Sequence, residues 1–292
     1  MSIRELRYRL LASVVVLCLG LMSVSDLVSA ADEPDLAEME EIGPQIGVST
    51  LNLNLSAVPG EILTGAIEVH NLGTEPEGVQ VLLADWEYDP SGAVSIHEHG
   101  TVDRSLAGML TVAPASMMLS PGETRPIQYR IEVPPDSVGS FWAMIMVRSE
   151  PKVISSSDFG EGRTAVFAAS KTYGIKLIVT AHSESEKELV IEDSAVEYLE
   201  AGEGSVLEIR SLVTNTGLAH LELTGTVNLI NEHGDSVGAA RIGRARVLPG
   251  YQRLVRTTLA GQLDPGFYVA VVVLDFGGDY LVGSQVEFEI GE

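Results

Sequence analysis

Apolar and polar residues alternate along most of the chain after residue 47, in short segments separated by Gly, Pro, Asn and Asp. Successive side chains of a β-strand point to opposite faces, so this alternation is typical of strands with one buried face. No stretch of ten or more residues has the period of an amphipathic helix. The pattern predicts an all-β protein, with strands in its first half near 48–55, 62–71, 79–88, 93–97, 109–112, 125–133, 141–149 and 164–180.

The segment 164–180 is predicted to form one long strand that closes a first module and leads into a second. One of its faces is apolar apart from Lys171, and includes Phe167, Ala169, Ile175 and Leu177. A strand of this length either runs along a whole sheet or leaves an edge open to a partner. The preceding Ser/Gly-rich segment, 154–162, is expected to be a loop.

The strand 141–149 is apolar on both of its faces. Phe141, Ala143 and Ile145 alternate with Trp142 and Met144, whereas a sandwich strand normally turns one face to water. Some other element should therefore cover the outward set. The sister module, a loop or a partner protein could do so, because a large exposed apolar patch often marks an interaction site.

The signals of the first module return in the same order in the second. Val69–Gly73 (VHNLG) corresponds to Val213–Gly217 (VTNTG), Leu119–Gly122 (LSPG) to Val247–Gly250 (VLPG), and a Gly-aromatic start of an apolar strand occurs at both 139–142 and 266–268. Such repetition predicts two related immunoglobulin-like β-sandwich domains in tandem. We expect the first at 47–180 and the second at 189–292, joined by a short polar linker at 181–188.

The N-terminus has the features of a secretory signal peptide over residues 1–30. Three arginines precede an apolar run from Leu10 to Met22, which is too short to span a bilayer, and small residues follow at Ser29 and Ala30. An acidic lead-in is expected at 31–46. The protein is thus predicted to be exported, to the periplasm or to the cell surface, with no stable membrane insertion after cleavage.

Composition narrows the classes of partner and of chemistry. The net charge of −23 argues against nucleic acid as a partner, and the single cysteine, Cys18, lies within the predicted signal peptide. His97 and His99 could share one strand face and hold a metal, and Asp85 with Glu87 could do acid–base work, but neither set has a further partner at a diagnostic spacing. We expect no enzyme activity, no cofactor and no resident metal.

Several short motifs resemble those of the PapD-like periplasmic pilus-assembly chaperones. They are Ala57-Val58-Pro59-Gly60, the strand ending at Asn71, Ser120-Pro121-Gly122-Glu123, Val133-Pro134-Pro135, Ser140-Phe141-Trp142 and Gly174-Ile175-Lys176-Leu177. The resemblance implies that the last strand of the first domain is lent to a subunit by strand addition, through Phe167 and Ala169. It also implies that Lys176 holds the subunit's terminal carboxylate together with an arginine from the first strand, where this chain has no arginine near Asn54.

The chain also resembles Gram-positive cell-surface proteins that interact with WxL-type proteins, which pair two such sandwiches. The sequence therefore supports two functions. The first is a secreted, non-enzymatic, chaperone-like protein-binding module for an envelope, pilus or surface protein, with Lys176, Phe167, Ala169, Trp142 and Met144 as candidate partner-binding residues. The second is a cell-wall-associated scaffold or adhesion module without chaperone activity.

Overall fold

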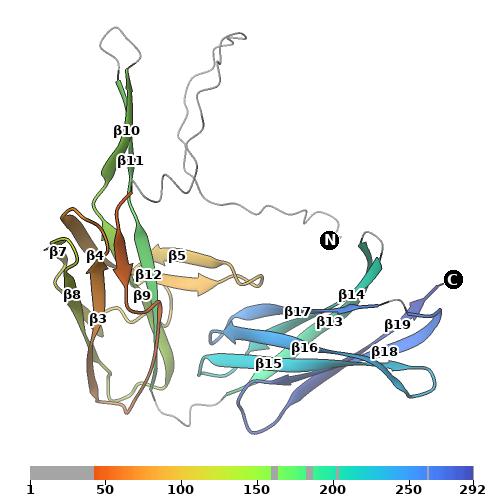
Figure 1. The fold of residues 1–292 in the computed structure, drawn as a ribbon. Coiled ribbons are helices and arrows are strands. Elements are labelled where there is room, and N and C mark those ends of the chain that lie inside the picture. Colours follow the sequence, from red (N-terminus) through yellow and green to blue (C-terminus); the bar gives the residue numbers. More distant parts are fainter. Residues whose placement is uncertain (1–42, 159–163, 182–186, 202–203, 262, 292) are drawn as a thin grey trace.

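The computed structural model describes residues 43–158, 164–181, 187–201, 204–261 and 263–291 (Figure 1). Within these ranges all regular secondary structure is β-strand. The described residues contain no helix that is long and apolar enough to cross a bilayer. The strands build two sandwiches in succession, so the predicted fold class of two tandem immunoglobulin-like β-sandwiches is confirmed. The predicted signal peptide and residues 31–42 of the lead-in lie outside the described residues.

The first sandwich packs a four-stranded sheet against a six-stranded one. The smaller sheet has the order β1-β3-β8-β6, with β1 (Ile46–Val48), β3 (Ile62–Asn71), β8 (Thr124–Glu132) and β6 (Leu110–Ala113). The larger sheet has the order β2-β12-β9-β4-β5, with β2 (Asn52–Ala57), β12 (Thr172–Ala181), β9 (Gly139–Ser149), β4 (Glu77–Tyr88) and β5 (Val94–Glu98), and β7 (Ser116–Leu119) pairs with β4.

The second sandwich packs a three-stranded sheet against a four-stranded one. The first has the order β13-β14-β17, with β13 (Leu189–Ala201), β14 (Gly204–Asn215) and β17 (Gln252–Ala260). The other has the order β16-β15-β18-β19, with β16 (Ser236–Val247), β15 (Leu221–Asn231), β18 (Gly266–Asp275) and β19 (Val282–Ile290).

The internal repeat predicted from the sequence is visible in the hydrogen bonds of two buried asparagines. Asn71 Nδ2 donates to the carbonyls of Glu75 and Leu119, and its Oδ1 accepts from the amide of Gly73. Asn215 makes the same three bonds, donating to Ala219 and Val247 and accepting from Gly217. Each asparagine thus ties the end of its strand to the proline-glycine turn of its own sandwich, and each satisfies polar groups that burial would otherwise leave unpaired.

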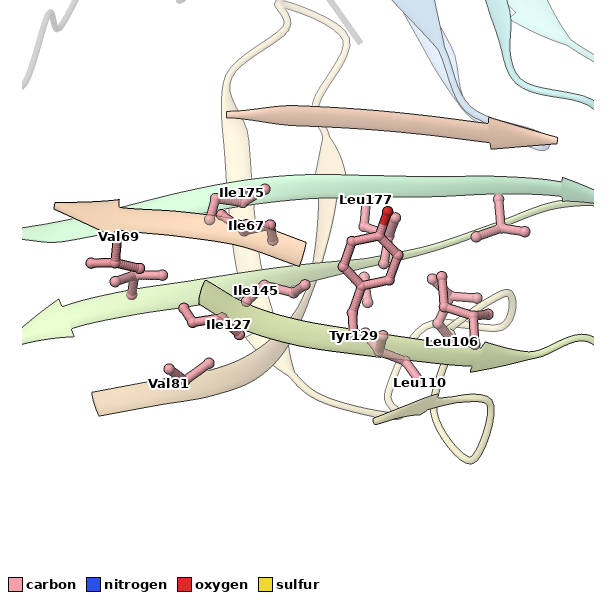
Figure 2. Close-up of a cluster of buried hydrophobic side chains, with 14 of the residues drawn as sticks. Ile67, Val69, Val81, Leu106, Leu110, Ile127, Tyr129, Ile145, Ile175 and Leu177 are labelled. Carbon is pink, nitrogen blue, oxygen red and sulfur yellow. The ribbon is translucent and has the colours of Figure 1, made fainter. Parts of the chain in front are cut away.

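The core of the first sandwich lies between its two sheets (Figure 2). Ile67 and Ile127 from the smaller sheet meet Ile145, Ile175 and Leu177 from the larger sheet, and all five are fully buried. Ile175 and Leu177 belong to the alternation that was predicted for 164–180, so the inward face of β12 was read correctly from the sequence.

The prediction of one continuous strand over 164–180 is wrong. The segment forms two strands, β11 (Thr164–Ala169) and β12, separated at Ser170 and Lys171. The break is held because the amide of Lys171 donates to Ser149 Oγ at 2.8 Å, while Ser149 donates its own amide to the carbonyl of Lys171 at 2.9 Å. The loop expected at 154–162 is also corrected, because its first part belongs to strand β10 (Lys152–Asp158); residues 159–163 lie outside the described residues.

Candidate functional site

Strands β10 and β11 form a two-stranded ribbon that extends away from the first sandwich (Figure 1). Within the described residues, β10 and β11 pair only with each other, from Lys152 opposite Ala169 to Asp158 opposite Thr164. Each strand therefore presents an outer edge of backbone groups without a neighbouring strand. A two-stranded hairpin is marginally stable in water, and an open edge is a template for pairing with another chain.

The ribbon also exposes large apolar side chains on both of its faces. Phe167, predicted as a partner-binding residue, is 54% exposed, and Val153 and Val166 are exposed to a similar extent. Ala169, the other residue predicted on this strand, is half-buried at the base of the ribbon, opposite Lys152. The structure thus brings Phe167 and Ala169 together on a ribbon whose apolar surface has no cover within the described chain.

Trp142 and Met144 have a different environment, because the second sandwich covers them. Both are buried in a cluster with Trp86 and Ile178 from the first sandwich and Leu248 from the turn between β16 and β17. We call this cluster, completed by Ala84, the inter-sandwich core. Of the covers that the sequence left open for this apolar face, the sister module is the one found. The expectation that a partner docks on Trp142 and Met144 is corrected accordingly, since neither side chain is accessible.

Hydrogen bonds fix the two tryptophans within the inter-sandwich core. Trp86 Nε1 donates to the carbonyl of Ala143 at 2.9 Å, and Trp142 Nε1 donates to the carbonyl of Trp86 at 2.8 Å. Tyr251 packs edge-on against Trp142 and donates its hydroxyl to Glu87 at 2.8 Å. Burial and this carboxylate both raise the pKa of Tyr251, so its hydroxyl stays a donor at any physiological pH.

Lys176 lies at the edge of this core, on β12. It pairs in parallel register with Asn52 of β2, and its Nζ donates to the hydroxyl of Tyr88 at 3.1 Å. The ammonium also stands 4.7 Å from the ring centroid of Tyr88 and 5.2 Å from that of Trp86, a cation–π arrangement. Among the described residues, no carboxylate forms an ion pair with Lys176.

A hollow of about 350 Å³ opens beside Lys176, between the two sandwiches. We call it the inter-sandwich hollow. Tyr88, Gly92 and Lys176 of the first sandwich line it together with Arg244, Ala245, Arg246 and Arg253 of the second. Arg246 is held by Glu222 at 2.7 Å, and it reaches Asn52 Oδ1 at 3.2 Å. The arginine that the resemblance places on the first strand is absent, and the cations facing Lys176 come from the second sandwich instead.

These arginines were not among the predicted site residues, although the sequence carries a signal for them. Five of the chain's 18 basic residues fall between positions 241 and 256, in a protein with a net charge of −23. Strands β16 and β17 carry that cluster, and the docking of the second sandwich turns part of it toward Lys176. Basic residues concentrated against the sign of the whole chain could have drawn attention to this stretch.

The two histidines considered as metal ligands are separated into different pairs. His97 Nε2 lies 3.3 Å from Glu87, and His99 Nδ1 lies 3.0 Å from Asp85. In the described part of the chain, no three His, Cys, Asp or Glu side chains are arranged to hold a metal ion. The buried Asp85 carboxylate also accepts hydrogen bonds from Ser105 and from three amides of the 100–102 loop, so it organises that loop.

Comparisons with known proteins show similarity of fold alone. No protein-family model and no curated protein sequence matches the chain. Solved structures that it is similar to include the class 5 fimbriae chaperone CfaA (10% identity, TM-score 0.45, covering 84% of this chain and 98% of that one) and the E. coli chaperone DraB (15%, 0.36, 85% and 99%). A PapD-like domain of human CEP192 is another (17%, 0.32, 56% and 98%). Fimbrial chaperones are thus among the structures similar to it, as the sequence resemblance predicted.

Proposed function

We propose that this chain is an exported, non-enzymatic module that binds an envelope or surface protein by adding a strand of that protein to the β10–β11 ribbon. The observation that carries the proposal is the ribbon itself, with two open edges and exposed Val153, Val166 and Phe167. In β-strand addition, backbone hydrogen bonds to an open edge supply affinity, and alternate side chains supply specificity. A partner strand would also bury apolar surface that now faces water.

Lys176 belongs to the same proposal as an anchor for a negatively charged end of the partner. It lies on β12, which follows β11 directly along the chain, and it faces a hollow with further cations. A strand that pairs along β11 and continues toward β12 would bring its terminal carboxylate near this ammonium. Lysine attracts a carboxylate as a point charge with three donors, of which Tyr88 takes one.

The proposal is tested by capture of a partner from envelope extract on the immobilised protein, followed by identification of what is retained. Phe167→Asp places a charge on the ribbon and is expected to abolish retention, because an unpaired buried carboxylate opposes docking. Phe267→Asp is the matched control, since Phe267 is 59% exposed on β18 of the second sandwich. Lys176→Ala is expected to weaken retention without abolishing it.

The competing function, a scaffold or adhesion module, predicts a different outcome. Its support is the inter-sandwich core, which joins the two sandwiches and would suit a spacer that transmits force. Retention of envelope material that survives both Phe167→Asp and Lys176→Ala would favour the scaffold and would reject strand addition at the ribbon.

A further inference from the structure

The inter-sandwich hollow holds more positive charge than one carboxylate would balance. Lys176, Arg244, Arg246 and Arg253 line it, and Glu222 is the carboxylate that pairs with this set in the described chain, at 2.7 Å from Arg246 and 3.7 Å from Arg244. Three positive charges are left uncompensated in a protein whose net charge is −23. A cluster of unpaired cations on an otherwise acidic protein favours binding of an anionic ligand at that place.

Arg253 is the residue of this set that is least satisfied by its own chain. Its Nε is buried and has no hydrogen-bond partner among the described residues, and none of the ion pairs found there involves its guanidinium. Its surroundings are the ring of Tyr88, 5.7 Å away, and the backbone of Gly92. A donor that is shielded from water and lacks an acceptor is unfavourable. Arg253 lines the hollow, so its guanidinium is available to an anionic ligand without first giving up an ion pair among the described residues.

Arg253 also lines a second hollow. This second hollow, again of about 350 Å³, is lined by Ser91, Arg244, Arg253 and Arg256 among others. Arg244 and Arg253 border both hollows, and Lys176 borders the first alone. Two anionic groups can therefore be placed, one near Lys176 and one between the arginines, whose planar forks suit carboxylates.

We infer that the inter-sandwich hollow takes a ligand with two neighbouring carboxylates, the chemistry of a protein C-terminus that ends in Asp or Glu. The inference rests on the proposed function, because the ligand is the end of the bound partner. It adds that the last residue of the partner has an acidic side chain, and that arginines of the second sandwich bind this side chain. Because the ligand contacts both sandwiches, its binding also links them.

The test compares two small mimics of a chain end on the full-length protein at low salt. N-acetyl-aspartate carries both the terminal and the side-chain carboxylate, whereas N-acetylalanine carries the terminal one alone. Affinities are measured by titration with NMR detection, and N-acetyl-aspartate is expected to bind about tenfold more tightly. Arg253→Gln and Arg244→Gln are expected to reduce this preference, while Lys176→Gln weakens both mimics. Arg125→Gln, on β8 of the first sandwich, is the control and leaves both affinities unchanged.

Two results would overturn the inference. One is equal or absent binding of the two mimics to the unsubstituted protein. The other is binding of inorganic phosphate as tight as that of N-acetyl-aspartate, which would mean that the hollow reads charge and not a chain end. Partner capture by the ribbon is scored separately with Phe167→Asp, so the loss of this preference with capture intact would reject the inference alone. Arg244, whose side chain is 71% exposed, keeps the test independent of any folding defect in the Arg253 variant.

Discussion

Leu248 is the side chain of the second sandwich that is buried in the inter-sandwich core, so Leu248→Ala should weaken the contact between the two sandwiches. Leu248 is fully buried in the same cluster as Trp86, Trp142, Met144 and Ile178. Truncation of a buried leucine removes its transfer free energy and leaves a cavity, with a typical cost of about 2–5 kcal/mol. The rigid indole rings on the first sandwich cannot collapse far into the gap, so we expect a cost of about 3 kcal/mol.

The assay is urea unfolding followed by tryptophan emission. The chain has two tryptophans, and both lie in the inter-sandwich core, so their emission reports on this contact directly. Leu248→Ala is expected to shift the emission to the red and to lower the urea midpoint. Leu281→Ala, at a site that is 60% exposed, serves as the control. An unchanged emission maximum and midpoint in Leu248→Ala would show that the second sandwich does not cover Trp142 and Met144.

Three further predictions concern the same junction and its supporting loop. Gly92→Ala would place a Cβ where the guanidinium of Arg253 lies, and it is expected to displace that side chain and to weaken anion binding. Gly60→Ala is the control, because Gly60 has a similar positive φ (+85° against +91°) in open space and its substitution should leave anion binding unchanged in the same titration. Burial between the sandwiches lowers the pKa of His220, so the unfolded chain binds this proton at a higher pH than the folded protein does. The stability contributed by the neutral ring is therefore complete above pH 6.5 and is lost as the pH falls below it. His220→Gln should flatten this part of the pH profile of the urea midpoint. Burial raises the pKa of Asp85, but the hydrogen bonds from Ser105, Val102, His99 and Gly100 outweigh burial and hold the pKa below 3.8. Asp85→Asn is therefore expected to cost about 1–3 kcal/mol of stability at pH 7. The difference from the unsubstituted protein should shrink once the pH falls through the folded-state pKa of Asp85, as calorimetry at pH 7 and at a pH below that pKa would show.

Local pattern was sufficient to predict most of the strands and the repeat, although it merged β1 with β2 and β11 with β12 and did not predict β7 and β10. Alternation identified the buried face of β12, with Ile175 and Leu177, because one buried face per strand is a property of each segment by itself. The Asn-x-Gly and Pro-Gly signals identified the repeat for the same reason, since each asparagine bonds to groups of its own sandwich. Such features require no knowledge of how the two sandwiches dock.

Features that depend on contacts between distant segments could not be predicted. The break at Lys171 arises from backbone and side-chain bonds to Ser149, and the β10–β11 pairing redirects residues that look like a simple continuation of β12. The cover of Trp142 by Leu248, and the approach of Arg253 to Lys176, join positions more than 70 residues apart. The sequence of β9 would show the same apolar pattern in a protein that exposes this face to a partner.

Amide hydrogen exchange of the complex shows whether the β10–β11 ribbon takes up a strand of the partner. With the captured partner bound, peptides covering Lys152–Asp158 and Thr164–Ala169 are predicted to exchange much more slowly than in the free protein, because the open edge becomes hydrogen-bonded. If the partner binds and protects other parts of the chain while both ribbon strands exchange as they do in the free protein, strand addition at the ribbon is wrong.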